Sequence, residues 1–289
     1  MTHFLYSHAP RRALPTPRRK PGEVPSRALP AFLGLTLLLS WGIAFAYIFA
    51  PEAMAALFGP MEGAHPLYFF MTWAPGLSGI LLVLHYGGRH GLKAFFSRLL
   101  RARAGLGWWL LVLAGLPATF MVGSLIKGGP LLAPLEDGAG QALVVSLVML
   151  FLGPMEEFGW RGVAQPLLQR HLAPIWAGAI IGAVWAFWHL PAFYLGGTVY
   201  AEWNFPLFLT GCVTIAVLMT PLFNAARGGL LLPMLVHWQL ILPIWPDAQP
   251  WDTWLLIAVT AVVVWVKRDT MFSRDTGRTG AVTQVIPQS

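Results

Sequence analysis

The chain has 289 residues, of which 56% are hydrophobic and only 11% are charged. An ordinary soluble domain is about 25% charged, so this composition excludes a water-soluble globular protein. The net charge of +7 does not indicate nucleic-acid binding, because the basic residues are spread over alternate loops instead of one face.

The apolar residues are grouped into segments close to the ~20 residues that a helix needs to cross a bilayer. We therefore predict an all-α, polytopic membrane protein with about eight transmembrane helices. Their expected ranges are 29–50, 67–86, 107–126, 141–158, 174–195, 203–223, 229–245 and 251–267. The depth of Glu156 in the bilayer agrees with the depths of His189 and His237 only if the fourth helix continues past Arg161 to about Gln169, with a kink at Pro166.

The distribution of basic residues predicts that both termini are cytoplasmic. With eight spans, the cytoplasmic regions hold 18 Lys and Arg residues and the outer loops hold only Lys127. This asymmetry is the positive-inside bias of membrane proteins. A seven-helix count would break the alternation, so eight is preferred.

The two ends of the chain differ in composition from the predicted bundle at 29–267. Residues 1–28 are rich in Pro and Arg and predict a disordered basic tail. Residues 268–289 form a polar C-terminal tail. Between helices two and three, residues 91–105 show the spacing of a short amphipathic helix on the cytoplasmic surface, with Arg98 on its basic face.

Few ionisable residues fall inside the apolar segments, where each costs about 2.5–3.5 kcal/mol. The stretch GPMEEFGWRG (153–162) nevertheless contains Glu156, Glu157 and Arg161. Glu157 and Arg161 are four residues apart, so they share a helix face and can pair. Glu156 is rotated from Glu157 by about 100° and is left in a drier setting, suited to a general base. The Gly-Pro pair at 153–154 loosens the helix just before these residues.

Two histidines fall inside later apolar helices: His189 in AVWAFWHLPAF and His237 in LLPMLVHWQLI. Together with Glu156 they form a Glu/His/His set on three helices, suited to holding and deprotonating a water molecule. The set can act by coordinating a divalent metal, or a Glu–His pair can polarise the water directly. A Glu–Arg packing bridge and hydrogen-bonded core histidines are the purely structural alternatives.

Three elements occur in order along the chain: EEFGWR, WAFWH and a later histidine in an apolar helix. Over about residues 141–245 this pattern resembles the CPBP family of intramembrane proteases, which includes type II CAAX prenyl endopeptidases and bacteriocin-immunity (Abi) proteins. The resemblance implies a peptidase in which Glu156 activates water together with His189. It also implies that Glu157 and Arg161 hold the helix and tune the site, and that His237 binds a metal or stabilises the oxyanion.

The resemblance further implies a membrane-embedded or lipidated peptide or protein substrate, a bacterial or archaeal plasma membrane as the location, and membrane lipids as neighbours. It leaves open whether Zn²⁺, held by Glu156, His189 and His237, takes part or whether the mechanism is metal-free. The sequence departs from the family pattern at two places. Trp185 stands where the second motif usually has Phe, and Ile241 stands where the third motif usually has Asn or Asp. Gln239 and Asn224 are the nearest polar substitutes for Ile241.

Three functions are consistent with these patterns. The first is an intramembrane endopeptidase. The second is a catalytically weak or inactive protein of the same fold that acts by binding, such as a bacteriocin-immunity factor, and Ile241 is its main support. The third is a proton-coupled transporter that uses the Glu/His set as a relay, although no internal repeat supports it.

Overall fold

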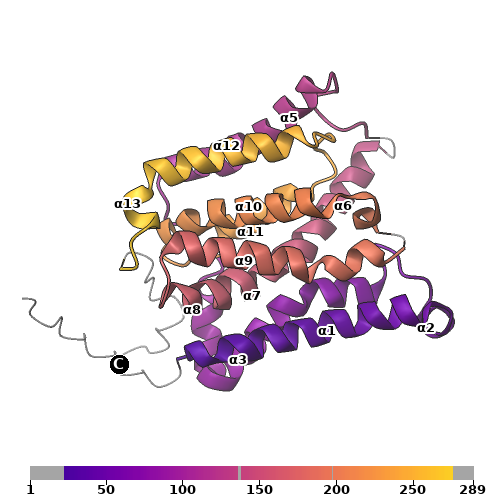
Figure 1. The fold of residues 1–289 in the computed structure, drawn as a ribbon, viewed down its shortest axis with the longest axis horizontal. Coiled ribbons are helices and arrows are strands. Elements are labelled where there is room, and N and C mark those ends of the chain that lie inside the picture. Colours follow the sequence, from indigo (N-terminus) through magenta and orange to yellow (C-terminus); the bar gives the residue numbers. More distant parts are fainter. Residues whose placement is uncertain (1–22, 136–137, 197, 276–289) are drawn as a thin grey trace, which may run out of the picture.

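A computed structural model describes residues 23–135, 138–196 and 198–275 of the protein. Within these residues the chain is helical and has no β-strand. Most helices run side by side along the long axis of the molecule, so their ends form two opposite faces (Figure 1). The predicted all-α fold is therefore confirmed. The tail residues 1–22 and 276–289 lie outside the described residues.

The N-terminal part contains η1 (Ser26–Ala28), α1 (Leu29–Phe49), α2 (Pro51–Phe58), α3 (Pro66–Phe96), α4 (Leu106–Leu110), η2 (Leu111–Gly115) and α5 (Leu116–Ile126). The segment with the paired glutamates contains α6 (Gly138–Leu152), η3 (Gly153–Glu156), α7 (Glu157–Gly159), η4 (Trp160–Ala164) and α8 (Gln165–Gln169). The remainder contains α9 (Pro174–Trp188), η5 (Leu190–Tyr194), η6 (Val199–Glu202), α10 (Phe205–Ala225), α11 (Leu231–Leu240), α12 (Trp251–Val266) and α13 (Arg268–Met271).

Six helical segments of the described chain are long and apolar enough to cross a membrane, and they coincide with the first six predicted spans. They are Ser26–Phe49, Pro66–Phe96, Leu106–Ile126, Gly138–Gln169, Pro174–Tyr194 and Phe205–Ala225. The last two predicted spans correspond to the shorter apolar helices α11 and α12. With 10 residues, α11 is only about 15 Å long, and two prolines follow it at 243 and 246. The count of eight crossings stays a prediction.

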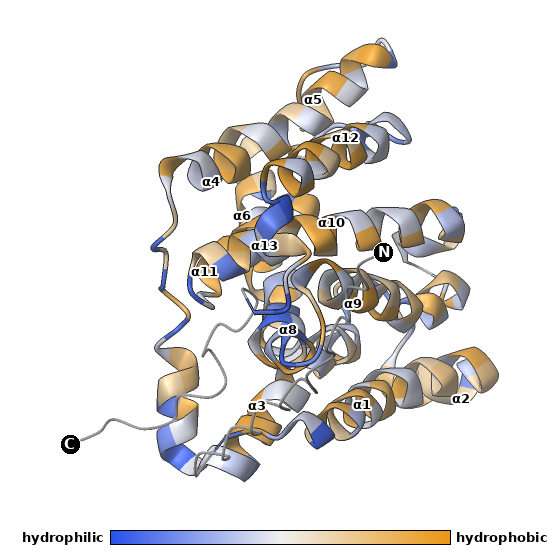
Figure 2. Cartoon of the chain, turned by 60° about the vertical axis from the view of Figure 1, so that its left-hand side comes forward, coloured by the Kyte–Doolittle hydropathy of each residue, from blue (hydrophilic) through white to orange (hydrophobic). Residues whose placement is uncertain are grey.

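The surface of the bundle is apolar where a soluble protein would be polar. Leu38 is 70% exposed, Phe49 79% and Leu113 60%. Figure 2 shows hydrophobic residues along the sides of the helices and hydrophilic ones gathered at the end that carries α8 and α13. Apolar surface of this extent is stable only against lipid. The chain is an integral, multi-pass membrane protein.

The helix that carries the paired glutamates is irregular along its middle. It reaches Gln169, as predicted, but η3 is a 3₁₀ turn and η4 is a π-helical turn. The first irregular turn begins at Gly153 and contains Pro154, which removes a backbone donor and disrupts the α-helical hydrogen-bond ladder. The irregular turn nearest to the kink expected at Pro166 is η4, which ends at Ala164, just before α8 and this proline.

Arg98 lies in a different environment from the predicted one. The helical segment after Gly88 does change direction, since Gly88 has φ 59° and ψ −158°. However, Arg98 is only 2% exposed, and its guanidinium donates to the carbonyls of Gly228 and Gly162. Carbonyls in irregular turns and at helix ends lack intrahelical partners, so a buried arginine is stabilised there. Arg98 thus links the loop at Gly228 to the π-helical turn at Gly162 and does not face lipid headgroups.

The last residues of the predicted N-terminal tail are ordered and pack on the bundle. Val24 is 2% exposed and Ala28 1% exposed. Arg170 anchors this segment, because its guanidinium lies 2.8 Å from Glu23 and donates to the carbonyl of Val24. Residues 23–28 are therefore part of the packed structure, because a buried valine and an ion pair offset the entropy that ordering costs.

Candidate active site

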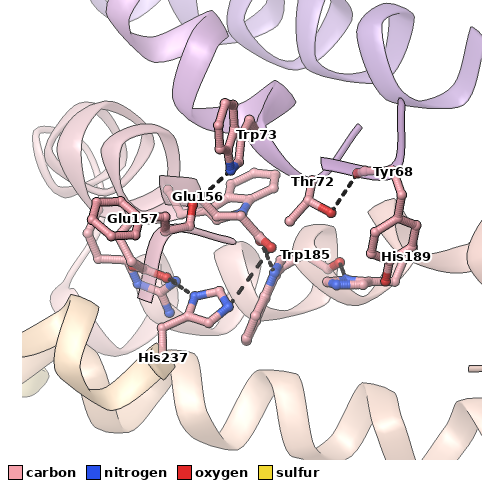
Figure 3. A network of polar contacts seen from close by, with 11 residues as sticks. Tyr68, Thr72, Trp73, Glu156, Glu157, Trp185, His189 and His237 are labelled. Carbon is pink, nitrogen blue, oxygen red and sulfur yellow. Dashed lines mark hydrogen bonds and ion pairs between the residues drawn. The ribbon is translucent and has the colours of Figure 1, made fainter. Parts of the chain in front are cut away.

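Glu156 lies inside the bundle at the end of η3 and is 2% exposed. Its Oε2 accepts hydrogen bonds from the indole N–H groups of Trp185, at 2.7 Å, and Trp160, at 3.2 Å (Figure 3). The turn approaches its neighbours closely, because a Cβ at Gly153 would collide with His237 and Ile241. The two indoles hold one carboxylate oxygen and leave Oε1 for other partners.

Glu157 points to a different set of partners. Its carboxylate lies 3.1 Å from Nη1 of Arg161, and both side chains are fully buried. Nδ1 of His237 lies 2.7 Å from Oε1 of Glu157. Because an ionised carboxylate only accepts hydrogen bonds, this Nδ1 carries a proton and donates it to Glu157. Glu157 thereby fixes the orientation of the His237 ring, although the two residues are 80 positions apart.

The other ring nitrogen of His237 faces Glu156. Its Nε2 lies 3.9 Å from Oε1 of Glu156. This distance is too long for a direct hydrogen bond, and it suits two groups that share a bridging water molecule. The free oxygen of Glu156 and the Nε2 atom of His237 therefore face each other at this point of the site.

His189 caps the C-terminal end of α9 and is 9% exposed. Its Nδ1 lies 2.8 Å from the backbone oxygen of Trp185. A carbonyl oxygen cannot donate, so Nδ1 carries the proton, and Nε2 is left as a hydrogen-bond acceptor. The ring is packed between Trp188, at 4.6 Å between centroids, and Tyr200, at 5.3 Å.

A cavity of about 810 Å³ opens beside these side chains, and its wall includes Glu156, His189 and His237. The wall is mostly apolar and is supplied by helices α1, α3, α5, α6, α9, α10, α11 and α12, by the turns η3 and η5, and by the loops near 198–203 and 241–249. A few polar groups in a large apolar hollow are typical of a ligand site. The volume is sufficient for an extended peptide segment of a few residues.

The part of the chain that carries this site is similar to a known protein family. A family model described as type II CAAX prenyl endopeptidase Rce1-like matches residues 138–240. Residues 138–240 are therefore similar to an Rce1-like domain. The matched range begins at the first residue of α6 and ends at the last residue of α11. No curated protein matches the chain. The Rce1-like domain supports membership in a family of CAAX-type intramembrane proteases.

Within the Rce1-like domain, the predicted site residues come together in two layers. Glu156, His189 and His237 line the cavity, whereas Glu157 and Arg161 do not line it and support His237 from behind. The helix spacing correctly indicated the pairing of Glu157 with Arg161. The contact between His237 and Glu157 was not predicted, because it joins two helices that are distant in sequence.

The three residues proposed as zinc ligands do not fit a metal site in this arrangement. No group of three His, Cys, Asp or Glu side chains in the described part of the chain is gathered closely enough to hold an ion. Nδ1 of both histidines donates to a protein acceptor, so only Nε2 of each ring is left to face an ion. Zinc needs ligand atoms about 2 Å from one centre. The arrangement of the described side chains therefore does not form a zinc site, and the participation of zinc stays a prediction.

Sequence analysis missed the tryptophan environment of Glu156. Trp160 stands four residues after Glu156, as Arg161 does after Glu157, so the same helical spacing indicated this contact. From the sequence, Trp185 is distinguished only as a substitution of Trp for Phe in the second motif. Its indole N–H bonds Glu156, and its ring lies 5.6 Å from the Arg161 guanidinium and 5.3 Å from the His237 ring. Trp185 therefore contacts both layers of the site.

Ile241 also lines the cavity, and its Cδ1 lies against Gly153 beside His237. Neither polar substitute replaces it. The amide of Asn224 exchanges two hydrogen bonds with Gln169, and the amide of Gln239 donates to the backbone of Val112. No polar side chain among these candidates therefore replaces the Asn or Asp of the family pattern at the position of Ile241.

Proposed function

We propose that the protein is an intramembrane endopeptidase in which Glu156 and His189 activate a water molecule that attacks a peptide bond. The observation that carries this proposal is the shared cavity, whose wall contains Glu156, His189 and His237 inside a lipid-facing bundle. The Rce1-like match over residues 138–240 agrees with protease activity. The enclosed, mostly apolar setting strengthens the electrostatic effect of each polar group.

The proposed steps use groups whose hydrogen-bonding roles follow from the geometry. Oε1 of Glu156 takes a proton from water while Nε2 of His189 accepts the second hydrogen bond of that water. The water oxygen then bonds to the amide carbon, and the carbonyl π electrons move onto oxygen. When this intermediate collapses, the C–N bond breaks and Glu156 returns its proton to the leaving nitrogen. Glu157 and Arg161 keep His237 oriented beside the reacting water.

The proposed substrate is a membrane-embedded or lipidated peptide that enters the bundle from the lipid. The domain family supports peptide substrates and a lipid environment in general, and a CAAX-type lipidated C-terminus is the finer proposal. Placement in a bacterial or archaeal plasma membrane also stays a prediction. The transporter alternative gains no support, because the ionisable residues of the site gather around one cavity at one end of the bundle and are not spread across it.

The test is cleavage by the purified full chain in lipid vesicles, with a panel of unmodified and prenylated membrane peptides and mass-spectrometric detection of products. Glu156→Gln and His189→Ala are each expected to lower kcat by about 10²–10⁴-fold, because each removes a group that moves or holds the proton. Glu62→Gln and His90→Ala, both at exposed positions, are the matched controls and should cleave normally.

Unchanged cleavage by Glu156→Gln would contradict the proposal. A chelator added to the wild-type enzyme tests the metal prediction separately. Full activity in chelator agrees with the side-chain mechanism, whereas loss that added Zn²⁺ restores would support a zinc site.

Ile241 favours one second candidate, a non-catalytic protein of the same fold that acts by binding, such as a bacteriocin-immunity factor. An apolar side chain beside His237 removes a polar group that hydrolysis would use. Under this alternative, the wild type cleaves no peptide, and Glu156→Gln and His189→Ala leave protection of cells against bacteriocin unchanged.

A further inference from the structure

Attack of water on an amide places a negative charge on the carbonyl oxygen, and a peptidase must supply hydrogen-bond donors to that oxygen. Ile241 supplies none. His237 has its Nδ1 proton committed to Glu157 and turns its other nitrogen to Glu156. The cavity must therefore contain another donor if the proposed function is correct.

Most hydroxyl and indole donors on the cavity wall already have acceptors. Trp185 donates to Glu156. The hydroxyls with backbone acceptors are those of Ser40, Thr72 and Thr198, which donate to the carbonyls of Thr36, Tyr68 and Ala192 respectively. None of these groups is free to bind a developing oxyanion without losing a bond that it already makes.

Two tyrosines on the same wall differ from these residues. Tyr68, from the first turn of α3, and Tyr200, from η6, both line the cavity with Glu156 and His189. Figure 3 shows the Tyr68 side chain extending toward His189, and the Tyr200 ring lies 5.3 Å from the His189 ring. The charge of Glu156 acts on both hydroxyls. Both tyrosines therefore line the same wall as Glu156 and His189, the residues proposed to hold the attacking water.

The hydroxyls of Tyr68 and Tyr200 also interact with each other. Each hydroxyl has one proton and two lone pairs, so when one tyrosine donates to its neighbour, the neighbour keeps its own O–H for a ligand. Burial raises the pKa of Tyr200 well above its ordinary value, which keeps this hydroxyl protonated at any physiological pH. The pair is thus a permanent donor at the cavity wall.

We propose that the Tyr68–Tyr200 hydroxyl pair donates to the oxyanion formed during peptide hydrolysis and so takes the place of the polar side chain that Ile241 lacks. The proposal rests on the proposed peptidase function. No proton leaves the pair: the carbonyl π electrons move onto oxygen, this oxygen accepts the free O–H, and the same electrons re-form the C=O bond when the C–N bond breaks. One tyrosine hydroxyl contacts the oxyanion, and the other tyrosine donates a hydrogen bond to that hydroxyl and so positions and polarises it.

The experiment compares Tyr68→Phe and Tyr200→Phe with the wild type in the vesicle assay. These changes remove only the hydroxyls and preserve both rings, of which that of Tyr200 packs against His189. Loss of one oxyanion donor lowers kcat by about 10²–10³-fold, with KM unchanged because the ground-state carbonyl is bound as before. A peptide phosphonate that imitates the tetrahedral intermediate should bind more weakly by the same factor, and an uncleavable substrate peptide should bind equally well.

Two tyrosines serve as matched controls. The hydroxyl of Tyr47 donates to the Gly59 carbonyl away from the cavity wall, so Tyr47→Phe loses a hydrogen bond and should retain the wild-type kcat. Tyr194, in η5, is 71% exposed, and Tyr194→Phe should also be silent. Thermal unfolding of each variant in detergent shows that the fold is kept.

A rescue variant separates a catalytic role from a structural one. Ile241→Asn introduces an amide donor beside His237, and in the Tyr68→Phe background it is expected to raise kcat by about tenfold. If wild-type cleavage depends on Glu156 but both Tyr→Phe variants keep their kcat and their affinity for the phosphonate, the tyrosine proposal is overturned and the peptidase proposal stands. If the wild type itself cleaves nothing, the peptidase proposal fails first.

Discussion

The indole N–H of Trp185 gives Glu156 a partner that phenylalanine at the same position would not provide. The hydrogen bond is 2.7 Å long and inside the bundle, where water does not compete for the carboxylate. With Trp160 holding the same oxygen at 3.2 Å, the carboxylate has one anchored and one free oxygen. At the scale of single residues, this asymmetry leaves Oε1 free for the proposed role of Glu156 as a general base.

Trp185→Phe tests this role, because it removes the donor and keeps an aromatic ring. A hydrogen bond to a charged group contributes about 1.5–3 kcal/mol, so kcat is expected to fall by about 10- to 100-fold, with little change in KM. Trp176→Phe is the control on the same helix, since Trp176 is 59% exposed. Steady-state cleavage in vesicles measures both. Equal rates for Trp185→Phe and the wild type would show that the indole bond does not position the base.

At the scale of secondary-structure elements, the position of the glutamates depends on close contact between α3 and the irregular η3–α7 segment. Glycines permit this contact. A Cβ at Gly76 would collide with the backbone oxygen of Met155, and a Cβ at Gly159 would collide with the backbone of Pro75. Small residues at such crossings let helix backbones approach in the membrane. The contact holds the 3₁₀ turn against α3 and so sets the depth of Glu156.

Gly159→Ala is expected to destabilise the protein by about 1–3 kcal/mol, because the extra methyl group meets backbone atoms that cannot rotate away. Gly42→Ala is the matched control: Gly42 is also in a spanning helix, but a Cβ there meets nothing within 4 Å. Thermal unfolding in detergent compares the two variants. A lower Tm for both alike, or for neither, would contradict the role assigned to the α3–α7 contact.

At the scale of the whole molecule, the basic loops and the cavity lie at different ends of the bundle. Arg170, Arg227 and Arg268 follow α8, α10 and α12, at the end where Figure 2 shows hydrophilic residues. The cavity is lined at the other end by loop residues such as Gly63 and Gln249. Together with the positive-inside bias, this arrangement predicts that the cavity opens away from the cytoplasm.

Cysteine labelling tests this sidedness. The single natural cysteine, Cys212, is 3% exposed, so the wild type is the blank for a membrane-impermeant maleimide. Ser97→Cys should react only in inside-out vesicles, because it lies at the basic end of α3, whereas Glu62→Cys and Gln249→Cys should react only in right-side-out vesicles. Labelling of Ser97→Cys and Gln249→Cys from the same side would refute the predicted topology of the cavity.

The sequence by itself determined those features that depend on neighbours along the chain. Hydropathy over about 20 residues located the first six spans, because the bilayer imposes a length on any helix that crosses it. The 3.6-residue repeat placed Glu157 next to Arg161 and separated Glu156 from both. Motif order and spacing predicted the membrane protease family, and the match at 138–240 confirmed this.

Only the tertiary structure decided how side chains from different helices meet. Helix periodicity shows which face a residue occupies but not which helix packs there. It therefore indicated neither the hydrogen bond from His237 to Glu157 nor the burial of Arg98 against the carbonyls of Gly228 and Gly162. The same limit applies to Tyr68 and Tyr200, which are ordinary aromatic residues in sequence. They become candidate oxyanion donors only because close packing, a property of the whole bundle, brings α3 and η6 to one cavity.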